Sequence, residues 1–194
     1  MKRSVLIFSF FISSFTAFGQ LSLQASYNIW FPTGKYNSDL NLGFLGISAE
    51  LKYAASDFVN VTAGVGFNLL GYETVRINRV ERPAEGFSDN AALSIIPLTI
   101  GAEVFFNEDK LRPYLDLDFG VALAKTTGDN LPETNTAVNP FISPGLGIAY
   151  SLTDDLIFNG VVKQNVIIYN YDNRPNYLEA FTAVGVNLGI TFKF

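Results

Sequence analysis

The sequence contains neither cysteine nor histidine in its 194 residues. Without cysteine, the chain can form no disulfide framework and no thiolate metal site. The lack of both residue types also excludes serine–histidine and cysteine–histidine nucleophilic pairs and the common zinc ligand sets. We therefore predict a non-enzymatic protein that holds no cofactor.

Positive charge is scarce as well, because only 13 Lys and Arg residues stand against 18 Asp and Glu residues. Proteins that bind nucleic acid neutralise its phosphates with clusters of Lys and Arg. An acidic chain without such clusters is not expected to have a nucleic-acid partner.

Residues 1–19 have the pattern of a secretory signal peptide. Two cationic residues precede an apolar run at 5–12, and a small-x-small pattern ends at Gly19. The apolar run is too short for a membrane-spanning helix, which needs about 20 residues. Cleavage after Gly19 leaves a domain of residues 20–194 with 11 cationic and 18 acidic side chains, a net charge of −7.

Apolar residues make up 48% of the chain, yet its downstream part offers no long apolar helix. The segment 91–106 comes closest, but Pro97, Gly101 and Glu103 interrupt it. A helix there would lose backbone hydrogen bonds at the proline and bury a charge. The apolar residues therefore indicate strands, in which apolar and polar side chains alternate.

The C-terminal segment 178–194 shows this alternation most clearly. Every second residue from Leu178 to Phe194 except Thr182 is apolar, and the residues between them are mostly small or polar. The side chains of a strand switch faces at each residue, so a period of two cannot lie on one face of a helix. The same test predicts eight strands, at residues 21–31, 45–53, 59–69, 96–106, 112–124, 141–152, 156–168 and 178–194.

Short and long connections alternate between these segments. Tight, polar connections lie at 55–57, 107–110 and 153–155, and longer ones lie at 32–41, 76–90, 126–139 and 171–177. Outer-membrane barrels have short periplasmic turns and longer outer loops. We therefore predict an all-β fold, an eight-stranded antiparallel up-and-down transmembrane β-barrel with both termini in the periplasm.

One face of the predicted strands mixes glycines with charged side chains. The charged residues that we assign to this face are Glu50, Lys52, Glu103, Arg112, Asp116, Asp118 and Lys163. The interior of an eight-stranded barrel is just wide enough for side chains, so this face is predicted to point inward and to fill a polar lumen. Asp116 and Asp118 could form an acid–base or cation-binding pair, but we favour a network of paired charges because unpaired buried charges are costly.

The opposite face carries branched aliphatic side chains, with aromatic ones near the short connections. These aromatic residues are Tyr53, Phe106, Tyr150, Phe158, Phe192 and Phe194. The pattern is typical of an aromatic girdle at a membrane interface, so outer-membrane lipid is the expected environment of this face.

The chain resembles the small eight-stranded outer-membrane barrels of the OmpA and OmpX type, and in particular the outer-membrane β-barrel proteins of Bacteroidetes. The resemblance rests on the strand pattern, on Ile190, Phe192 and the terminal Phe194, and on the stretch Arg112-Pro113-Tyr114 that opens a strand. It implies export to the outer membrane of a Gram-negative cell, with Ile190, Phe192 and Phe194 as the signal for the barrel-insertion machinery. A resemblance at this level says little about what the barrel does.

Three functions are compatible with this pattern. The first is a non-enzymatic barrel with a filled lumen, which acts through its surface loops or as a structural component in adhesion, ligand binding or membrane integrity. The second is a narrow pore or small-solute transporter, although the inward charges would obstruct its lumen. The third is a soluble lipocalin-like carrier, which would need apolar residues inside and polar residues outside.

Overall fold

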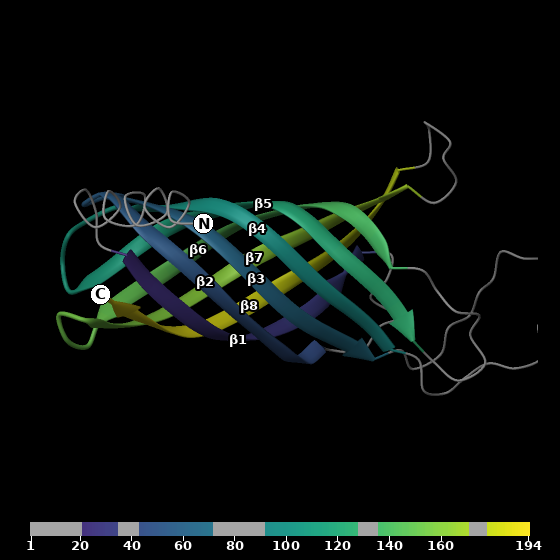
Figure 1. Cartoon of the computed structure of the whole chain (residues 1–194), viewed down its shortest axis with the longest axis horizontal. Helices are drawn as coiled ribbons and strands as arrows, with labels where there is room; N and C mark the ends of the chain where they lie inside the picture. The colour runs from purple at the N-terminus through teal and green to yellow at the C-terminus, as the bar shows by residue number, and fades with distance from the viewer. Residues whose placement is uncertain (1–20, 35–42, 72–91, 128–135, 171–177) are drawn as a thin grey trace, which may run out of the picture.

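The computed structural model describes residues 21–34, 43–71, 92–127, 136–170 and 178–194. These residues form eight antiparallel strands that pair in sequence order and close into a barrel (Figure 1). The strands are β1 (Leu21–Thr33), β2 (Gly43–Ser56), β3 (Val59–Gly71), β4 (Ala92–Phe105), β5 (Leu111–Thr127), β6 (Ala137–Ser151), β7 (Leu156–Asn170) and β8 (Leu178–Lys193). The predicted eight-stranded up-and-down barrel is confirmed.

Pairing between β1 and β8 closes the barrel. The two strands pair from Ser22 opposite Lys193 to Thr33 opposite Thr182, so neither keeps a free edge over that length. Following the paired residues from Leu23 through all eight strands leads back to β1 at Thr33, ten residues further along. A stagger of this kind tilts the strands relative to the barrel axis, typically by roughly 35–45°. The tilt is visible in Figure 1.

Three short turns lie at one end of the barrel, which we call the turn end. They consist of residues 57–58, 106–110 and 152–155, and β1 starts and β8 ends at the same end (Figure 1). Backbone hydrogen bonds join neighbouring turns to the ladder, for example from Ser151 N to Lys110 O at 2.9 Å. The opposite end, where β1 ends and β2 begins, is called the loop end.

The strands extend further toward the loop end than the sequence pattern predicts. β4 starts at Ala92 instead of residue 96, and β5 and β6 pair as far as Ala124 opposite Ala137. The predicted connection at 126–139 is therefore too wide. The alternation ends before the strand does because Leu93 and Ile95 are apolar and yet point inward.

Several other predictions fall on segments outside the described residues. These segments include the signal peptide at 1–19 and the long connections at 76–90 and 171–177. Within the described residues, no helix is long and apolar enough to span a membrane.

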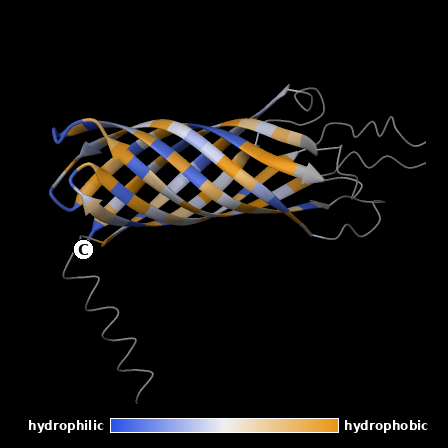
Figure 2. Cartoon of the chain, turned by 90° about the horizontal axis from the view of Figure 1, so that it is seen from above, coloured by the Kyte–Doolittle hydropathy of each residue, from blue (hydrophilic) through white to orange (hydrophobic). Residues whose placement is uncertain are grey.

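Hydrophobic and hydrophilic residues alternate along the strands, as the orange and blue segments in Figure 2 show, and the hydrophobic ones form the outer surface of the barrel. Ile47, Ile100 and Leu146 point outward and expose 64%, 68% and 63% of their surface. The aromatic residues predicted for the girdle lie near the turn end, and Phe106, Tyr150, Phe158, Phe192 and Phe194 are all exposed. A lipocalin-like carrier has the reverse arrangement of faces, so this alternative does not fit the structure.

A bulge between β1 and β2 shows how this apolar surface keeps its backbone groups bonded. The register shifts between Asn28 and Trp30, so that Ile29 of β1 lies opposite two residues of β2, Phe44 and Leu45. The outward hydroxyl of Tyr27 donates a hydrogen bond to the carbonyl oxygen of Phe44. A buried or lipid-exposed carbonyl left without a donor would be costly, so the tyrosine stabilises the bulge.

An arginine on the outer face tests the assignment of faces. Leu117 points outward near the middle of β5, and we expect Leu117→Arg to reduce the free energy of unfolding in lipid vesicles by about 2–4 kcal/mol. Val138 also points outward but lies at the loop end of β6, so Val138→Arg should cost about 0–1 kcal/mol. Equal losses for the two variants in urea titrations would show that the face or the depth is misassigned.

Candidate functional site

The lumen is the part of the molecule where polar side chains collect. Buried polar residues come from all eight strands, and the charged ones among them are Lys52, Glu103, Asp116, Asp118 and Lys163. Glu50, half-buried, lies among them. Because strands alternate their faces, residues two apart on neighbouring strands are stacked along the same inner wall.

The first group of charges surrounds Lys52 of β2. Its ammonium group forms ion pairs with Glu103 of β4 and with Glu50 at 3.4 Å. The second carboxylate oxygen of Glu103 accepts a hydrogen bond of 2.8 Å from the Asn60 amide. Both oxygens of this buried carboxylate are therefore bonded.

The second group of charges surrounds Lys163 of β7. Its ammonium group lies 2.8 Å from Asp116 Oδ2 and 2.6 Å from Asp118 Oδ2, both on β5. The two aspartates, which the sequence also allows as an acid–base or cation-binding pair, thus share one lysine. Among the described residues, no group of three or more His, Cys, Asp or Glu side chains is arranged to hold a metal ion.

Arg112 is the member of the predicted network that does not join it. Its Nε donates to Asn107 O at 3.1 Å, and another guanidinium nitrogen donates to Asp57 O. The guanidinium also lies 4.1 Å from the centre of the Phe105 ring. The prediction that Arg112 pairs with the inward carboxylates is therefore wrong, because Arg112 is the second residue of β5 and bonds to the backbone carbonyl oxygens of two turns at that end.

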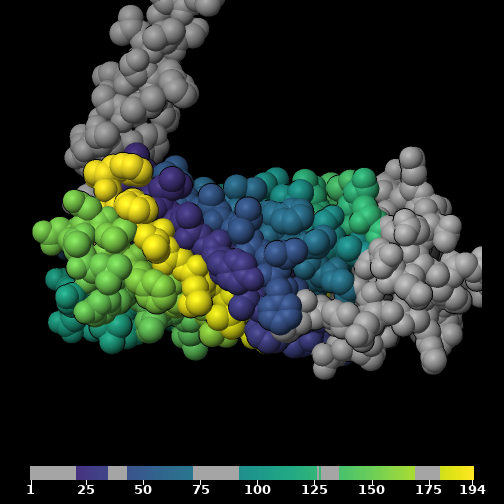
Figure 3. Space-filling view, turned by 90° about the horizontal axis from the view of Figure 1, so that it is seen from below, coloured from purple at the N-terminus to yellow at the C-terminus, as the bar shows by residue number. Residues whose placement is uncertain are grey.

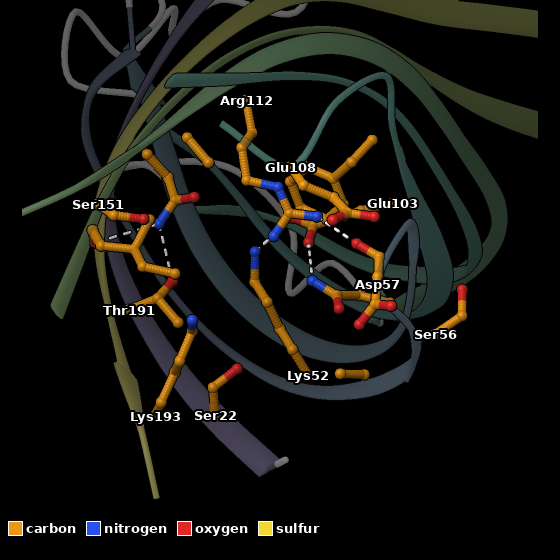
Figure 4. Close-up of a pocket in the computed structure, with 16 residues that line it drawn as sticks. Ser22, Lys52, Ser56, Asp57, Glu103, Glu108, Arg112, Ser151, Thr191 and Lys193 are labelled. Carbon is orange, nitrogen blue, oxygen red and sulfur yellow. Dashed lines mark hydrogen bonds and ion pairs between the residues drawn. The ribbon is translucent and has the colours of Figure 1, made fainter. Parts of the chain in front are cut away.

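A cavity of about 250 Å³ opens into the lumen at the turn end (Figure 4). Its lining includes both signs of charge and several hydroxyl groups, from Ser22, Lys52, Ser56, Asp57, Glu103, Glu108, Arg112, Ser151, Thr191 and Lys193. Figure 4 shows Lys52 reaching into the middle of this space from the wall, with Arg112 and Glu108 above it. The cavity ends at the Lys52 group of charges.

A second, smaller cavity of about 50 Å³ lies further toward the loop end, beside Asp118 and Lys163. Asp118 Oδ1, Asn165 Nδ2 and both polar atoms of the Asn68 amide line this region and have no protein partner among the described residues. A polar space of this size has room for a few water molecules, each of which needs two to four polar partners. Water is therefore the expected partner of these atoms.

The loop end of the lumen is apolar, which corrects the prediction of a polar lumen throughout. Buried residues form what we call the loop-end cluster: Trp30, Leu70, Leu93, Ile95, Ala122, Ala124, Phe141, Ile167, Phe181 and Ala183. The Trp30 and Phe141 rings stack with centroids 6.5 Å apart and planes 3° apart. These side chains come from every strand except β2 and meet inside the barrel, so they fill the lumen near the loop end.

A smaller apolar group, Phe105, Tyr114, Ala149 and Val161, packs inside near the turn end. Tyr114 is 1% exposed and lies flat against Gly147 on the neighbouring strand. A methyl group at Gly147 would come within 2.6 Å of the Tyr114 hydroxyl oxygen, so glycine is required there. The sequence indicates an inward glycine at this position but not the ring that needs it.

Of the residues predicted as an insertion signal, Ile190 and Phe192 lie on the outer side of β8 and Phe194 directly follows the strand. Ile190, Phe192 and Phe194 are exposed by 42%, 55% and 79%. Figure 3 shows β8 in yellow on the outer surface beside the first strand in purple. Their role in insertion stays a prediction.

No known protein family and no curated protein matches the sequence. The fold, however, is similar to solved structures of small outer-membrane barrels. Neisserial surface protein A is 15% identical, with 90% of this chain and 97% of that chain covered and a TM-score of 0.60.

Two further structures are similar at a TM-score of 0.54. Ail, the attachment invasion locus protein of Yersinia pestis, in complex with the heparin analogue sucrose octasulfate, is 14% identical over 91% of this chain and 97% of that one. The outer membrane protein OprG from Pseudomonas aeruginosa is 13% identical over 91% and 96%. The chain therefore has the fold of these barrels. The narrower resemblance to the OmpA and OmpX type and to Bacteroidetes proteins stays a prediction.

Removing the lysine that two carboxylates share tests the second group of charges. We expect Lys163→Met to reduce the free energy of unfolding by about 3–5 kcal/mol, because Asp116 and Asp118 would then be buried without a cation. Adding Asp116→Asn and Asp118→Asn removes the charges together and should recover most of the loss. Unfolding in lipid vesicles can be followed by the fluorescence of Trp30, the single tryptophan. If the triple variant is as unstable as the single one, the pairing is not what stabilises the barrel.

Proposed function

We propose that the protein is a non-enzymatic, non-conducting barrel of the outer membrane, which acts through its outer connections or as a structural component. The observation that carries this proposal is the filling of the lumen at two levels. The loop-end cluster packs across the inside near one end, and the ion pairs of Lys52 and Lys163 occupy the part nearer the turn end. Side chains leave little room for a continuous water path in an eight-stranded barrel.

Membrane insertion follows from the outer surface. A wall of exposed Leu, Ile, Val and Phe side chains is unfavourable in water and favourable in hydrocarbon. A closed barrel also leaves no unpaired strand edge in a solvent that cannot form hydrogen bonds. In this proposal the signal peptide at 1–19 is cleaved near Gly19, the turn end faces the periplasm with both termini, and the insertion machinery binds Ile190, Phe192 and Phe194.

Binding at the cell surface is proposed for the connections at the loop end. Ail has the same fold and was crystallised with a sulfated heparin analogue, so a barrel of this size can serve as a support for ligand binding. Among the described residues of this chain, the loop-end cluster fills the lumen at that end, so the connecting segments are the proposed place for contact with a surface ligand, in adhesion or ligand binding. Membrane integrity is the alternative role of the same filled barrel.

Fractionation tests the location of the protein. We expect it in the outer-membrane fraction after washing with high salt, because apolar contact with lipid does not weaken when charges are screened. On gels, the unboiled sample should migrate differently from the boiled one because a closed barrel unfolds slowly. Recovery in the soluble periplasm would contradict the proposal.

Conductance measurements test whether the lumen is filled. Purified protein in planar bilayers is expected to give no stable stepwise current. Trp30→Ala combined with Phe141→Ala removes two stacked rings from the loop-end cluster and should raise the leakage of small ions. Phe119→Ala is the matched control, since it removes an aromatic ring from the outer face.

A steady current through the unmodified protein would favour the narrow pore instead. In that case the charged groups around Lys52 and Lys163 would become the selectivity-determining residues. Leakage that is equal in the Phe119→Ala variant and in the double variant would show that the rings inside do not block the lumen.

A further inference from the structure

One polar side chain, that of Gln164, lies in the middle of the apolar outer surface. Gln164 is the ninth of the 15 residues of β7 and points outward between Val162 and Val166. Among the described strand residues, it is the one outward amide or charged side chain that lies away from the strand ends. The outward residues around it are Ile142, Pro144 and Leu146 on β6 and Thr182, Val184 and Val186 on β8. The Thr182 hydroxyl donates to the Thr33 carbonyl oxygen of β1 at 3.1 Å.

The Gln164 amide has no hydrogen-bond partner in the part of the chain that the structure describes. Tyr27 provides the contrast, because its outward hydroxyl donates to the Phe44 carbonyl oxygen. In water an unpartnered surface amide is ordinary. On a surface that faces hydrocarbon, the same amide has two N–H donors and a carbonyl acceptor without partners, which is costly.

The pairing between neighbouring strands is interrupted at two prolines, the inward Pro97 and the outward Pro144. Only the interruption at Pro144 has a side-chain amide, that of Gln164, on the outer face. Between β3 and β4 the pairing skips the positions around Pro97, where Phe67 and Ile96 cover the outside. Between β6 and β7 it skips the positions between Ile142–Val166 and Gly145–Lys163, where register sets Pro144 opposite Gln164. Proline has no N–H to donate to the ladder, so at this second interruption the outer face carries an amide where the ladder lacks a donor.

We propose, on the basis of the membrane insertion proposed above, that two copies of the chain associate in the membrane about a twofold axis beside Gln164, with the two amides bonded to each other. A primary amide is self-complementary, because its N–H can donate to the carbonyl oxygen of an identical group while its own oxygen accepts in return. A twofold axis along the membrane normal brings identical patches together and needs no second kind of site.

The surroundings of Gln164 suit close contact between two walls. Pro144 lies opposite Gln164, and Gly160 lies four residues away on the same outward face of β7. Both are compact, which lets two backbones approach. The neighbouring Val and Ile side chains are β-branched and have few rotamers, so packing them against a second copy costs little side-chain conformational entropy. Acyl chains offer no donor or acceptor, so a lipid tail at this site would leave the amide unpartnered.

Cysteine crosslinking locates the contact, since the chain has no cysteine of its own. Val162→Cys leaves Gln164 in place and puts a thiol two residues away on the same outward face. Val65→Cys is the matched control, because Val65 is outward, is 47% exposed, lies in the middle of β3 and is four strands from β7. In vesicles treated with a short bis-maleimide, we expect at least tenfold more crosslinked dimer from Val162→Cys than from Val65→Cys.

The chemistry of the contact is tested in the Val162→Cys background. Gln164→Leu keeps the size and removes the amide, and should weaken dimer formation by roughly tenfold. Gln164→Asn keeps an amide on a shorter side chain and should retain part of the dimer. Equal crosslinking at residues 162 and 65, or crosslinking that Gln164→Leu does not lower, overturns the proposal.

Gel migration of unboiled samples separates this inference from the proposed function. A folded, membrane-bound barrel that does not crosslink at residue 162 disproves the dimer and leaves the outer-membrane barrel intact. Failure of the unmodified protein to enter membranes removes the basis of both.

Discussion

The hydrogen-bonded pairing of β1 with β8 is the constraint on which the other features depend. It turns eight strands into a wall without a free edge, and its stagger of ten residues determines tilt and width together. Once the wall is closed, every second residue must point into a narrow interior and its neighbours must point out. Side-chain hydrogen bonds inside the lumen also join these strands. Thr191 of β8 donates to Gln24 of β1 at 2.9 Å and accepts from Asn159 of β7 at 2.8 Å.

Within that wall, two kinds of filling follow each other along the axis. Near the turn end and the centre, Lys52 and Lys163 each lie between two carboxylates, an arrangement that offsets part of the cost of burying charge. Near the loop end the same inward positions hold large apolar side chains, with Trp30 against Phe141. The polar part is satisfied by ion pairs, hydrogen bonds and small spaces for water, and the apolar part by packing. This division explains why a single description of the lumen as polar is incomplete.

In the proposed membrane environment, the outer face has a different requirement, because hydrocarbon supplies no hydrogen bonds. Where the ladder between β1 and β2 is irregular, the Tyr27 hydroxyl supplies the missing donor. Where proline interrupts the ladder between β3 and β4, apolar residues cover the outside. The interruption between β6 and β7 instead carries the amide of Gln164, which distinguishes this face of the barrel from the others.

The sequence by itself determined the number of strands, their order and the face of nearly every residue, because a period of two is a local property of the chain. It also indicated which charges point inward. Only the tertiary structure decided which charges meet: Arg112 is inward by period, yet it bonds to the carbonyl oxygens of Asn107 and Asp57 because register puts it beside the turns. The loop-end cluster likewise depends on closure, since Trp30, Phe141 and Ile167 belong to three strands and share a height only through the stagger around the barrel. The two-residue alternation along a strand shows whether a side chain points inward or outward. Its height along the barrel axis and its neighbours across the lumen follow from the strand register and from closure of the barrel.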